Sequence, residues 1–212
     1  MSHDDFASEP VLGLPETPPE GERILWQGRP DWLSLSWDAL SLPWVAGYFV
    51  LLALWRFVAV MDLMPLGQAI GASVPFLILG GLVIAMLLIV GYVQARATVY
   101  TVTNRRIAMR IGAALTVTLN LPYTQVASAD LALRRRGTGT IALSLMGDTR
   151  LSYLVCWPHV RPWRMRETQP TLRCIPDPEK VAALIADAAQ ARVTTPQVAR
   201  STQGGATAVA AE

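Results

Sequence analysis

The chain has 212 residues, of which 52% are hydrophobic and only 16% are charged. Soluble domains usually carry roughly 25% charged residues, so this composition argues against a purely soluble protein. A mean hydropathy of +0.34 is low for a chain that is embedded in a membrane throughout. The charge is also uneven, because residues 1–41 hold eight acids and two arginines while residues 96–212 hold fifteen basic and seven acidic residues. We therefore expect a small membrane part joined to a folded soluble part, with an interaction surface or a membrane-facing side.

The N-terminal part of the chain divides into two segments. Residues 1–20 are rich in Asp, Glu and Pro, and they are predicted to be a flexible acidic tail. This start lacks the basic residues of a signal peptide. In residues 21–41 a short apolar core lies between glycine turn signals, which predicts one strand near residues 22–28 and then an approach to the membrane. Three tryptophans precede or begin the first apolar run, as is common at a membrane–water interface: Trp32, Trp37 and Trp44.

Two long apolar runs follow. Residues 43–64 and 69–93 are each long enough to cross about 30 Å of hydrocarbon, and the short linker between them predicts a transmembrane helical hairpin over residues 42–95. The linker holds Asp62 and no Lys or Arg, so the positive-inside rule predicts that both termini face the cytoplasm. Arg56 interrupts the first run beyond its middle, where it could reach the far interface or pair with a partner protein.

From residue 98 the apolar pattern changes to a period of two, which is typical of half-buried strands. Turn residues separate the short segments, and this arrangement predicts an antiparallel barrel or sandwich. Near the end of the chain, Asp177 as N-cap and Pro178 in the first position open a helix with apolar residues on one face. The expected strands cover residues 98–104, 106–112, 114–121, 125–134, 139–146, 149–156 and 170–175.

Six or seven strands followed by one C-terminal helix is the layout of a pleckstrin-homology (PH)-like fold. The first strand would lie before the helical hairpin, and the others would lie within residues 96–192. The expected fold class is therefore membrane-anchored α+β, with a two-helix transmembrane hairpin and a PH-like antiparallel barrel or sandwich capped by a C-terminal helix. Residues 193–212 are rich in Thr, Ala and Gly and are predicted to be disordered.

Residues typical of catalysis or metal binding are sparse. Cys156 and Cys174 lack CxxC spacing and a paired His cluster, so we expect buried apolar residues and not zinc ligands. The motifs of nucleophilic hydrolases, phosphate-binding loops, zinc proteases and dinucleotide-binding folds are missing from the sequence. The two apolar runs also lack the paired polar residues of a transporter. We expect no enzyme activity, no metal, no cofactor and no nucleic-acid partner.

Two groups of polar and basic residues follow the hairpin. Asn104, Arg105, Arg106 and Arg110 lie on a predicted strand pair soon after the chain leaves the membrane. They could dock a partner or anionic lipid, or they could merely fix the orientation of the spans. The second group consists of Arg96, Arg134, Arg135 and Arg136. These residues are predicted to contact lipid, an acidic partner or the acidic N-terminal tail. For the three consecutive arginines at 134–136, the alternative is a solvated loop.

Residues 157–166, "WPHVRPWRMR", favour neither a strand nor a helix. Their prolines remove backbone donors and stiffen the chain, and Trp and Arg are enriched in binding hot spots. We predict a protein-binding loop. The alternatives are a rigid loop that packs Trp157 and Trp163 into the barrel, and a loop that contacts the membrane surface. The predicted partner-binding residues of this loop are Trp157, Pro158, His159, Arg161 and Trp163.

Several segments together point to one family. The most specific are "WPHVRPW" at 157–163 and "YTVTNRR" at 100–106, although the second also matches the wider set of bacterial PH-like membrane proteins. With "GERILWQGRPDW", "LNLPYTQV", "RRRGTGTIALSL" and "LRCIPDPEKVAALI", they resemble the PuhB family of photosynthetic complex assembly proteins from purple bacteria. The resemblance covers about residues 1–190 and places the hairpin at the same position.

This resemblance implies a non-enzymatic assembly factor in the bacterial inner, intracytoplasmic membrane. The implied partners are subunits of the photosynthetic reaction centre, its core antenna, or both, together with membrane lipid. The protein could also form a homo-oligomer. The competing interpretation is a membrane-tethered PH-like module that binds anionic lipid and has no photosynthetic role.

Overall fold

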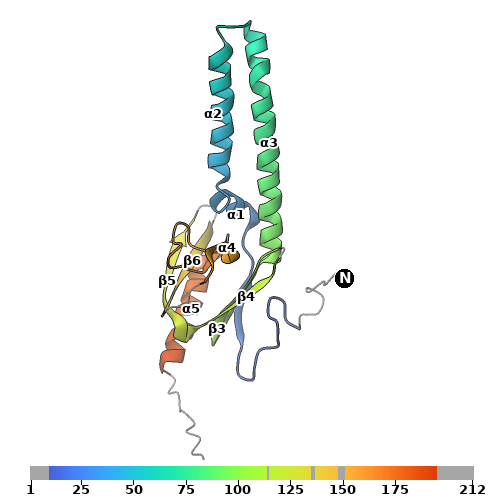
Figure 1. Cartoon of the computed structure of the whole chain (residues 1–212). Helices are drawn as coiled ribbons and strands as arrows, with labels where there is room; N and C mark the ends of the chain where they lie inside the picture. The colour runs from blue at the N-terminus through green and yellow to red at the C-terminus, as the bar shows by residue number, and fades with distance from the viewer. Residues whose placement is uncertain (1–9, 114, 135–136, 148–150, 195–212) are drawn as a thin grey trace, which may run out of the picture.

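The computed structural model describes residues 10–113, 115–134, 137–147 and 151–194. A pair of long helices stands on a domain built from strands and shorter helices (Figure 1). The elements are β1 (Ile24–Gly28), α1 (Trp32–Asp38), α2 (Leu42–Val60), α3 (Leu66–Ala97), β2 (Val99–Thr103), β3 (Arg106–Ile111), β4 (Val117–Pro122), the 3-10 turn η1 (Tyr123–Gln125), β5 (Val126–Leu133), β6 (Thr138–Leu145), α4 (Tyr153–Cys156), β7 (Thr171–Pro176) and α5 (Pro178–Thr194).

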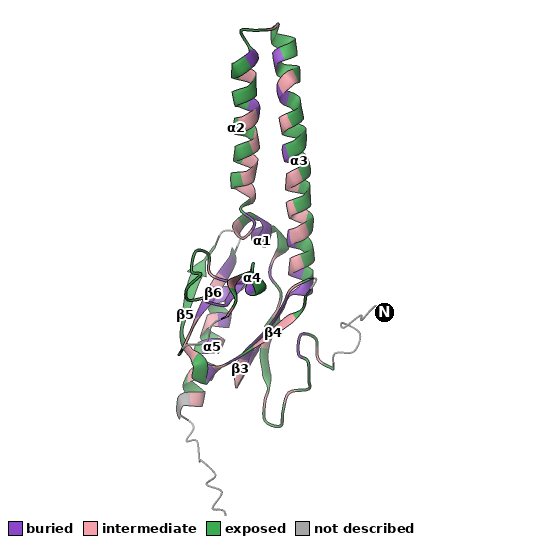
Figure 2. Ribbon diagram, viewed as in Figure 1, coloured by how far each residue is buried: buried purple, intermediate pink, exposed green. Residues whose placement is uncertain are grey.

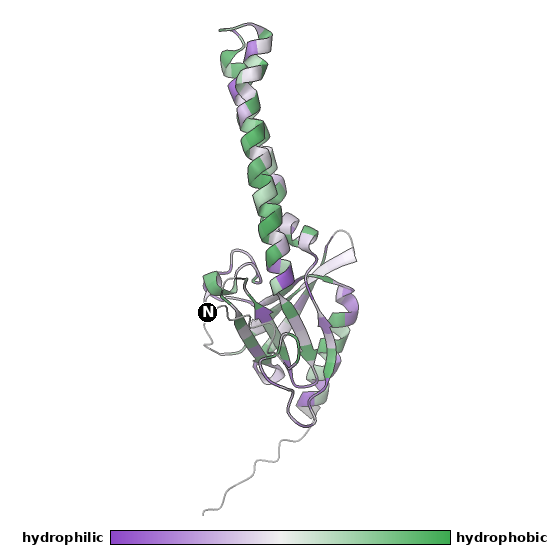
Figure 3. Ribbon diagram, turned by 90° about the vertical axis from the view of Figure 1, so that its right-hand side faces the viewer, coloured by the Kyte–Doolittle hydropathy of each residue, from purple (hydrophilic) through white to green (hydrophobic). Residues whose placement is uncertain are grey.

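Within the described residues, α2 and α3 are the two helices that are long and apolar enough to cross a membrane. Their 19 and 32 residues correspond to about 29 Å and 48 Å at 1.5 Å per residue, whereas the hydrocarbon layer is about 30 Å thick. Both are largely exposed outside their mutual contact (Figure 2) and are apolar along most of their length (Figure 3). The two helices lie against each other where the absent side chain of Gly80 makes room for Phe49. The last turns of α3 therefore extend beyond the segment that α2 covers.

The first sheet has the strand order β1-β2-β3-β4, and all its pairs are antiparallel. β1 precedes the helical hairpin and β2 follows it, yet Trp26 lies opposite Val102 and Gly28 lies opposite Tyr100. The prediction of a domain divided by the hairpin is confirmed. All five residues of β2 are buried, because this strand is paired on both edges and covered on both faces.

The second sheet has the order β5-β6-β7 and is also antiparallel. One core joins both sheets to α5, and it includes Ile107 of the first sheet, Ile141 of the second and Ile185 of the helix. α5 begins at Pro178 as predicted. Val181, Ile185 and Ala188 are buried, which confirms the predicted apolar face. The α+β fold with two apolar helices and a PH-like domain thus agrees with the sequence-based expectation.

The sequence did not predict α1, the short helix between β1 and α2. The side chain of Asp31 accepts a hydrogen bond of 2.8 Å from the backbone N–H of Ser34 and so caps its first turn. Leu35 is fully buried and packs against Ala95 of α3 and Cys174 of β7. α1 therefore joins the end of the long helix to the second sheet and fixes the orientation of the domain relative to the helical pair.

The predicted strand over residues 149–156 is wrong for its described part. Residues 148–150 lie outside the described residues, and α4 follows as a single helical turn. Cys156 is buried, and Tyr153 is half-buried against the same core. One helical turn brings residues i and i+3 to the same side, whereas a strand would have placed Val155 beside Tyr153 on the inner face.

The flexible N-terminal tail predicted over residues 1–20 is also corrected where the structure describes it. Leu14 is fully buried. Gly13 has a φ of 79° and lies against the side chain of Val99, where a Cβ atom would come too close. This segment therefore packs on the first sheet in spite of its prolines and acids. Residues 1–9 lie outside the described part of the chain.

Candidate functional site

The basic hairpin between β2 and β3 does not lie at the point where the chain leaves the long helix. β2 starts directly after α3 and has five residues, which span about 17 Å in a strand. Asn104 and Arg105 form the turn at its far end, so the expectation of a hairpin next to the membrane exit is corrected. Arg110 pairs with Val99 and so lies at the near end. Its side chain is buried at 1% exposure and offers no surface to a partner.

The turn of this hairpin binds the N-terminal segment of the same chain. The side-chain Nδ2 of Asn104 donates to the carbonyl of Gly21 at 2.9 Å, and its Oδ1 accepts from the backbone N–H of Arg23 at 2.8 Å. Nη2 of Arg105 donates to the carbonyl of Glu20 at 3.1 Å. These contacts continue the edge of the sheet beyond β1, so Asn104 and Arg105 serve an intramolecular contact.

Arg106 forms the tightest ion pair of this region. Its Nε atom lies 2.9 Å from Oε1 of Glu22, and the Glu22 side chain is only 2% exposed. A charge that is removed from water needs a close partner of opposite charge. Loss of either Glu22 or Arg106 would therefore leave the other charge without its compensation. A contact between the acidic N-terminal segment and the basic run at 134–136 was an alternative to the solvated loop expected there. In the described residues, the N-terminal segment contacts the basic hairpin.

Residues 157–166, which we call the Trp loop, combine a buried base with an exposed tip. Pro158, His159 and Val160 are buried. Trp163 is 89% exposed and Trp157 is 41% exposed, so the alternative in which these two rings pack into the barrel is wrong. Trp163 lies in a turn and has a φ of 65°, in the left-handed region that residues with a side chain seldom adopt. Exposed apolar residues of this loop and of the neighbouring α4 are Leu154, Val155, Trp157, Trp163 and Met165.

His159 holds the base of the Trp loop against the end of α3. Its Nε2 lies 2.9 Å from Oγ1 of Thr98, and its Nδ1 lies 2.6 Å from the hydroxyl of Tyr100. The Thr98 hydroxyl donates its proton to the carbonyl of Gln94, so it can only accept from His159. The histidine therefore carries its proton on Nε2, and Tyr100 donates to Nδ1. His159 was predicted to contact a partner, but a fully buried ring with both nitrogens bonded is a positioning residue.

The same cluster keeps its groups uncharged. Burial and, to a lesser degree, the charge of Arg173 lower the pKa of His159 from 6.5 to about 3. Burial likewise raises the pKa of the Tyr100 hydroxyl well above its usual value. His159 is therefore neutral over the physiological pH range, and the hydrogen-bond pattern given above is the one that persists there.

Arg173 of β7 connects the Trp loop with α1. Its Nη1 donates to the carbonyl of Pro158 at 3.2 Å, and its Nη2 donates to the carbonyl of Asp38 at 3.4 Å. The side chain is 5% exposed. Sequence reasoning missed this residue, although a charged side chain inside the apolar strand "TLRCI" is itself a signal of a buried partner.

Arg161 fixes the loop to the outer face of the second sheet. Its Nη1 lies 2.9 Å from Oδ2 of Asp130 and 3.2 Å from Oε1 of Gln169. The amide of Gln169 in turn donates to the hydroxyl of Ser144 at 3.0 Å. A cavity of about 320 Å³ lies between this face and the loop, and Asp130, Arg161 and Arg173 are among its lining residues.

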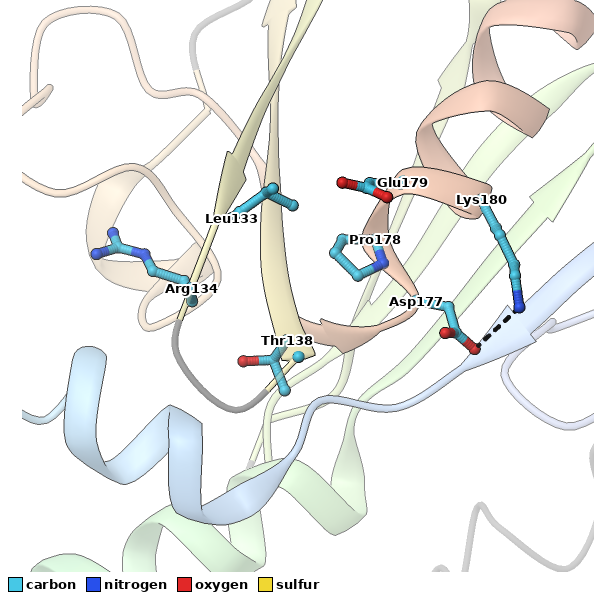
Figure 4. Close-up of a pocket in the computed structure, with 8 residues that line it drawn as sticks. Leu133, Arg134, Thr138, Asp177, Pro178, Glu179 and Lys180 are labelled. Carbon is cyan, nitrogen blue, oxygen red and sulfur yellow. Dashed lines mark ion pairs between the residues drawn. The ribbon is translucent and has the colours of Figure 1, made fainter.

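A second cavity of about 270 Å³ lies where α5 begins. Its charged lining residues are two basic residues, Arg134 and Lys180, and two acidic residues, Asp177 and Glu179. Lys180 lies 3.8 Å from Asp177 and pairs with it (Figure 4). The balanced charges give this cavity no preference for an anion or a cation.

The remaining predicted lipid-facing arginines are dispersed. Arg96 in the last turn of α3 donates to the hydroxyl of Tyr92 at 3.2 Å and lies over its ring. Arg134 lies 3.6 Å from the carboxylate of Asp38 at the end of α1. Arg135 and Arg136 lie outside the described residues. The two described arginines are therefore both close to the junction of the domain with the long helices.

The two cysteines are buried residues, as the sequence predicted. Cys156 and Cys174 are free and buried. Burial raises the pKa of both thiols, to about 12 for Cys174. Among the described residues, no group of three or more His, Cys, Asp or Glu side chains could hold a metal ion.

Comparisons with known proteins agree with this architecture. A family model described as "Bacterial PH domain" matches residues 39–189. The chain is also 45% identical over 214 aligned residues to an "Uncharacterized 23.7 kDa protein in puhA 5'region" of Rhodobacter capsulatus, with 100% of both chains covered. No solved structure matches the chain. Since the family model covers well over half of the sequence, the chain belongs to the bacterial PH domain family.

Proposed function

We propose that this protein is a non-enzymatic assembly factor for the photosynthetic reaction centre and its core antenna. It would act from the cytoplasmic surface of the intracytoplasmic membrane, where its two apolar helices anchor it. The resemblance to the PuhB family supports this role. A second support is the relative that matches over its full length. Its description refers to the 5′ region of puhA, a gene name that shares its first three letters with the name of the PuhB family.

One structural observation carries the proposal. The tip of the Trp loop exposes 89% of Trp163 and 67% of Met165, while its base is held by His159 and Arg173. Isolated exposed apolar residues are common, but several large ones on one rigid segment mark an interaction site. A rigid loop binds with little loss of conformational entropy, and Trp is enriched among the residues that dominate binding energy.

The position of the Trp loop fits a partner that is itself in the membrane. Thr98, which bonds His159, directly follows the last residue of α3. Asp38, which bonds Arg173, lies only four residues before the first residue of α2. The loop is therefore presented beside the membrane surface, where subunits of a membrane complex expose their own loops and helix ends.

Affinity purification of the full chain from membranes that are assembling photosynthetic complexes tests this proposal. We expect reaction-centre or antenna polypeptides to co-purify with the wild type. We expect Trp163→Ala to reduce their recovery about thirtyfold, because truncation of a central aromatic anchor weakens binding by about 2 kcal/mol. Leu115→Ala is the matched control, because Leu115 is 83% exposed on the β3–β4 turn.

Two results would count against the assembly role. The first is a wild-type protein that recovers no photosynthetic polypeptide, which would favour the lipid-binding module without a photosynthetic role. The second is a Trp163→Ala protein that recovers as much as the wild type. Thermal melting of the purified variants is the folding control. Because Trp163 is largely exposed and makes few contacts in the folded chain, we expect Trp163→Ala to leave the melting temperature unchanged.

A further inference from the structure

The only charged residue of α2 is Arg56, and the fold gives it no partner. Its side chain is exposed. Within the described part of the chain it takes part in no hydrogen bond and no ion pair. A guanidinium group stays charged in proteins, so Arg56 cannot avoid the cost of leaving water by losing its proton.

Arg56 lies inside the apolar layer and not at its surface. Trp44 at the start of α2 is 81% exposed and suits the membrane–water interface next to the domain. Arg56 follows it by twelve residues, or about 18 Å of helix, which leaves about 12 Å of a layer about 30 Å thick. Exposed apolar residues continue beyond Arg56 to the turn, among them Val58 and Leu63. A charge at the centre of a span is unfavourable by about 3 kcal/mol.

The direction of the side chain does not favour the nearer membrane surface. Each Cα–Cβ bond of an α-helix tilts toward the helix N-terminus. The N-terminal end of α2 is the end next to the domain (Figure 1). The stem of Arg56 therefore starts toward the middle of the layer, whereas the nearer surface lies at the turn between α2 and α3. A long charged side chain can extend to the surface, but Arg56 would first have to reverse this direction.

The hairpin itself and a second copy of the chain are poor partners for Arg56. Asp62 is the only acid in residues 42–95. It lies in the turn, six residues after Arg56, and the described structure holds no ion pair between the two. In a dimer with its two-fold axis along the membrane normal, equivalent residues lie at the same depth. Arg56 would then meet a like charge, which repels it.

The surroundings of Arg56 suit a helix of another polypeptide. Leu52 and Ala59 lie on the same face of α2, one turn before and one turn after Arg56. Ala59 is exposed, and a small side chain lets a second helix approach closely. A carboxylate on that helix can accept two parallel N–H bonds from one guanidinium group. Such a pair compensates both charges inside the bilayer.

We propose that Arg56 forms an ion pair within the bilayer with an Asp or Glu on a membrane-spanning helix of a partner polypeptide. This inference rests on the proposed function, because the partner is a subunit of the photosynthetic complex that the protein helps to assemble. The pair gives the protein a second contact with that complex, separate from the Trp loop and located on α2.

Affinity purification of the full chain from assembling membranes in a mild detergent tests the charge. We expect Arg56→Leu to lower the recovery of reaction-centre and antenna polypeptides at least about tenfold, because the partner carboxylate loses its compensating charge. Arg56→Lys keeps the charge and should recover more than Arg56→Leu. Leu54→Ala is the matched control, since Leu54 is 56% exposed on nearly the opposite side of α2, and it should recover as much as the wild type.

Photo-cross-linking locates the partner while Arg56 stays in place. The photoreactive residue p-benzoylphenylalanine replaces either Leu52, on the face of Arg56, or Leu54, on the other side of the helix. We expect the probe at Leu52 to cross-link to a reaction-centre or antenna polypeptide, within a spanning segment that contains Asp or Glu. The probe at Leu54 should give much less of this product.

The other outcomes overturn the ion pair. Undiminished recovery with Arg56→Leu would remove it and leave the proposed function intact, whereas a wild type that recovers no photosynthetic polypeptide would remove both. Cross-links from Leu52 to lipid alone, to a second copy of the chain or to a segment without an acid would also contradict it. If Arg56→Leu fails to insert into the membrane, the cross-linking result decides by itself.

Discussion

The Nε2 atom of His159 lies 2.9 Å from the Oγ1 atom of Thr98, the residue that directly follows α3. This buried hydrogen bond ties the base of the Trp loop to the end of a candidate membrane span. The loop base cannot move away from α3 without leaving polar groups unpaired in the interior, which is unfavourable by about 1–3 kcal/mol for each group. The exposed tip of the loop is therefore held at one place relative to the membrane anchor.

The first prediction concerns His159→Phe. We expect the free energy of unfolding of the full chain in detergent to fall by about 1–3 kcal/mol near neutral pH, because the Tyr100 hydroxyl loses its acceptor. Thermal unfolding followed by circular dichroism measures this change. An unaltered melting curve would show that the buried cluster contributes nothing to stability.

The pH dependence gives the same variant a second readout. The pKa of His159 is lowered from 6.5 to about 3 in the folded chain. Between these values the unfolded chain binds a proton that the folded chain does not bind. Wild-type stability from this residue is therefore complete above about pH 6.5 and falls toward pH 3, by up to about 1.4 kcal/mol per pH unit. In His159→Phe, the free energy of unfolding should depend less steeply on pH between about pH 3 and 6.5 than in the wild type. An identical pH dependence in both proteins would contradict the lowered pKa of His159.

The second prediction concerns Glu22→Gln. Because the Glu22 carboxylate is 2% exposed and pairs with Arg106 at 2.9 Å, the substitution should lower the free energy of unfolding by about 2 kcal/mol. Lys180→Gln is the matched control, since Lys180 and Asp177 are largely exposed and 3.8 Å apart, and exposed pairs contribute about 0–1 kcal/mol. Equal losses in the two variants would show that the Glu22 pair is not a special contact.

The third prediction concerns the junction of α1 with α3. A Cβ atom at Gly91 would overlap Oγ of Ser36 and approach Leu40, so Gly91→Ala should displace α1 and destabilise the chain by about 1–3 kcal/mol. Gly81→Ala, on the same helix but with open space around it, should leave the melting temperature nearly unchanged. Limited proteolysis between β1 and α2 gives an independent measure, and equal cleavage of the two variants would contradict the packing of α1.

The fourth prediction concerns the divided domain. A fragment of residues 96–192 lacks β1, so β2 becomes an unpaired edge strand, and such edges promote aggregation. Residues 20–31 attached through a short linker should restore a monodisperse protein, because they return the partner of β2. Size-exclusion chromatography distinguishes the two. A monodisperse and cooperatively unfolding fragment 96–192 would mean that β1 is dispensable.

The fifth prediction concerns topology. The turn between α2 and α3 holds no Lys or Arg, while Arg96 lies in the last turn of the second helix, so both termini should face the cytoplasm. A green fluorescent protein fused after Arg192 should be fluorescent, and alkaline phosphatase at the same position should be inactive. Active phosphatase there would reverse the orientation.

The sequence by itself determined the outline of this protein. Two apolar runs of spanning length, a change of period from the helical to the two-residue pattern after residue 98, and an Asp-Pro helix start before residue 179 predicted the hairpin, most strands and α5. The strand at 22–28 could be assigned to the domain on the other side of the hairpin because the PH-like layout of six or seven strands and one helix has a place for it. Such features are local, since each depends on the burial of one face within a few consecutive residues.

Only the tertiary structure decided which polar residues meet. Glu22 and Arg106 are separated by 84 positions, and His159 and Thr98 by 61, so no local pattern announces either pair. α1 and the buried Leu14 were missed for the same reason, because their burial comes from surfaces supplied by α3 and the first sheet. The basic hairpin was predicted to bind a partner and binds its own chain, since a charged group is satisfied by whichever opposite charge the fold brings near.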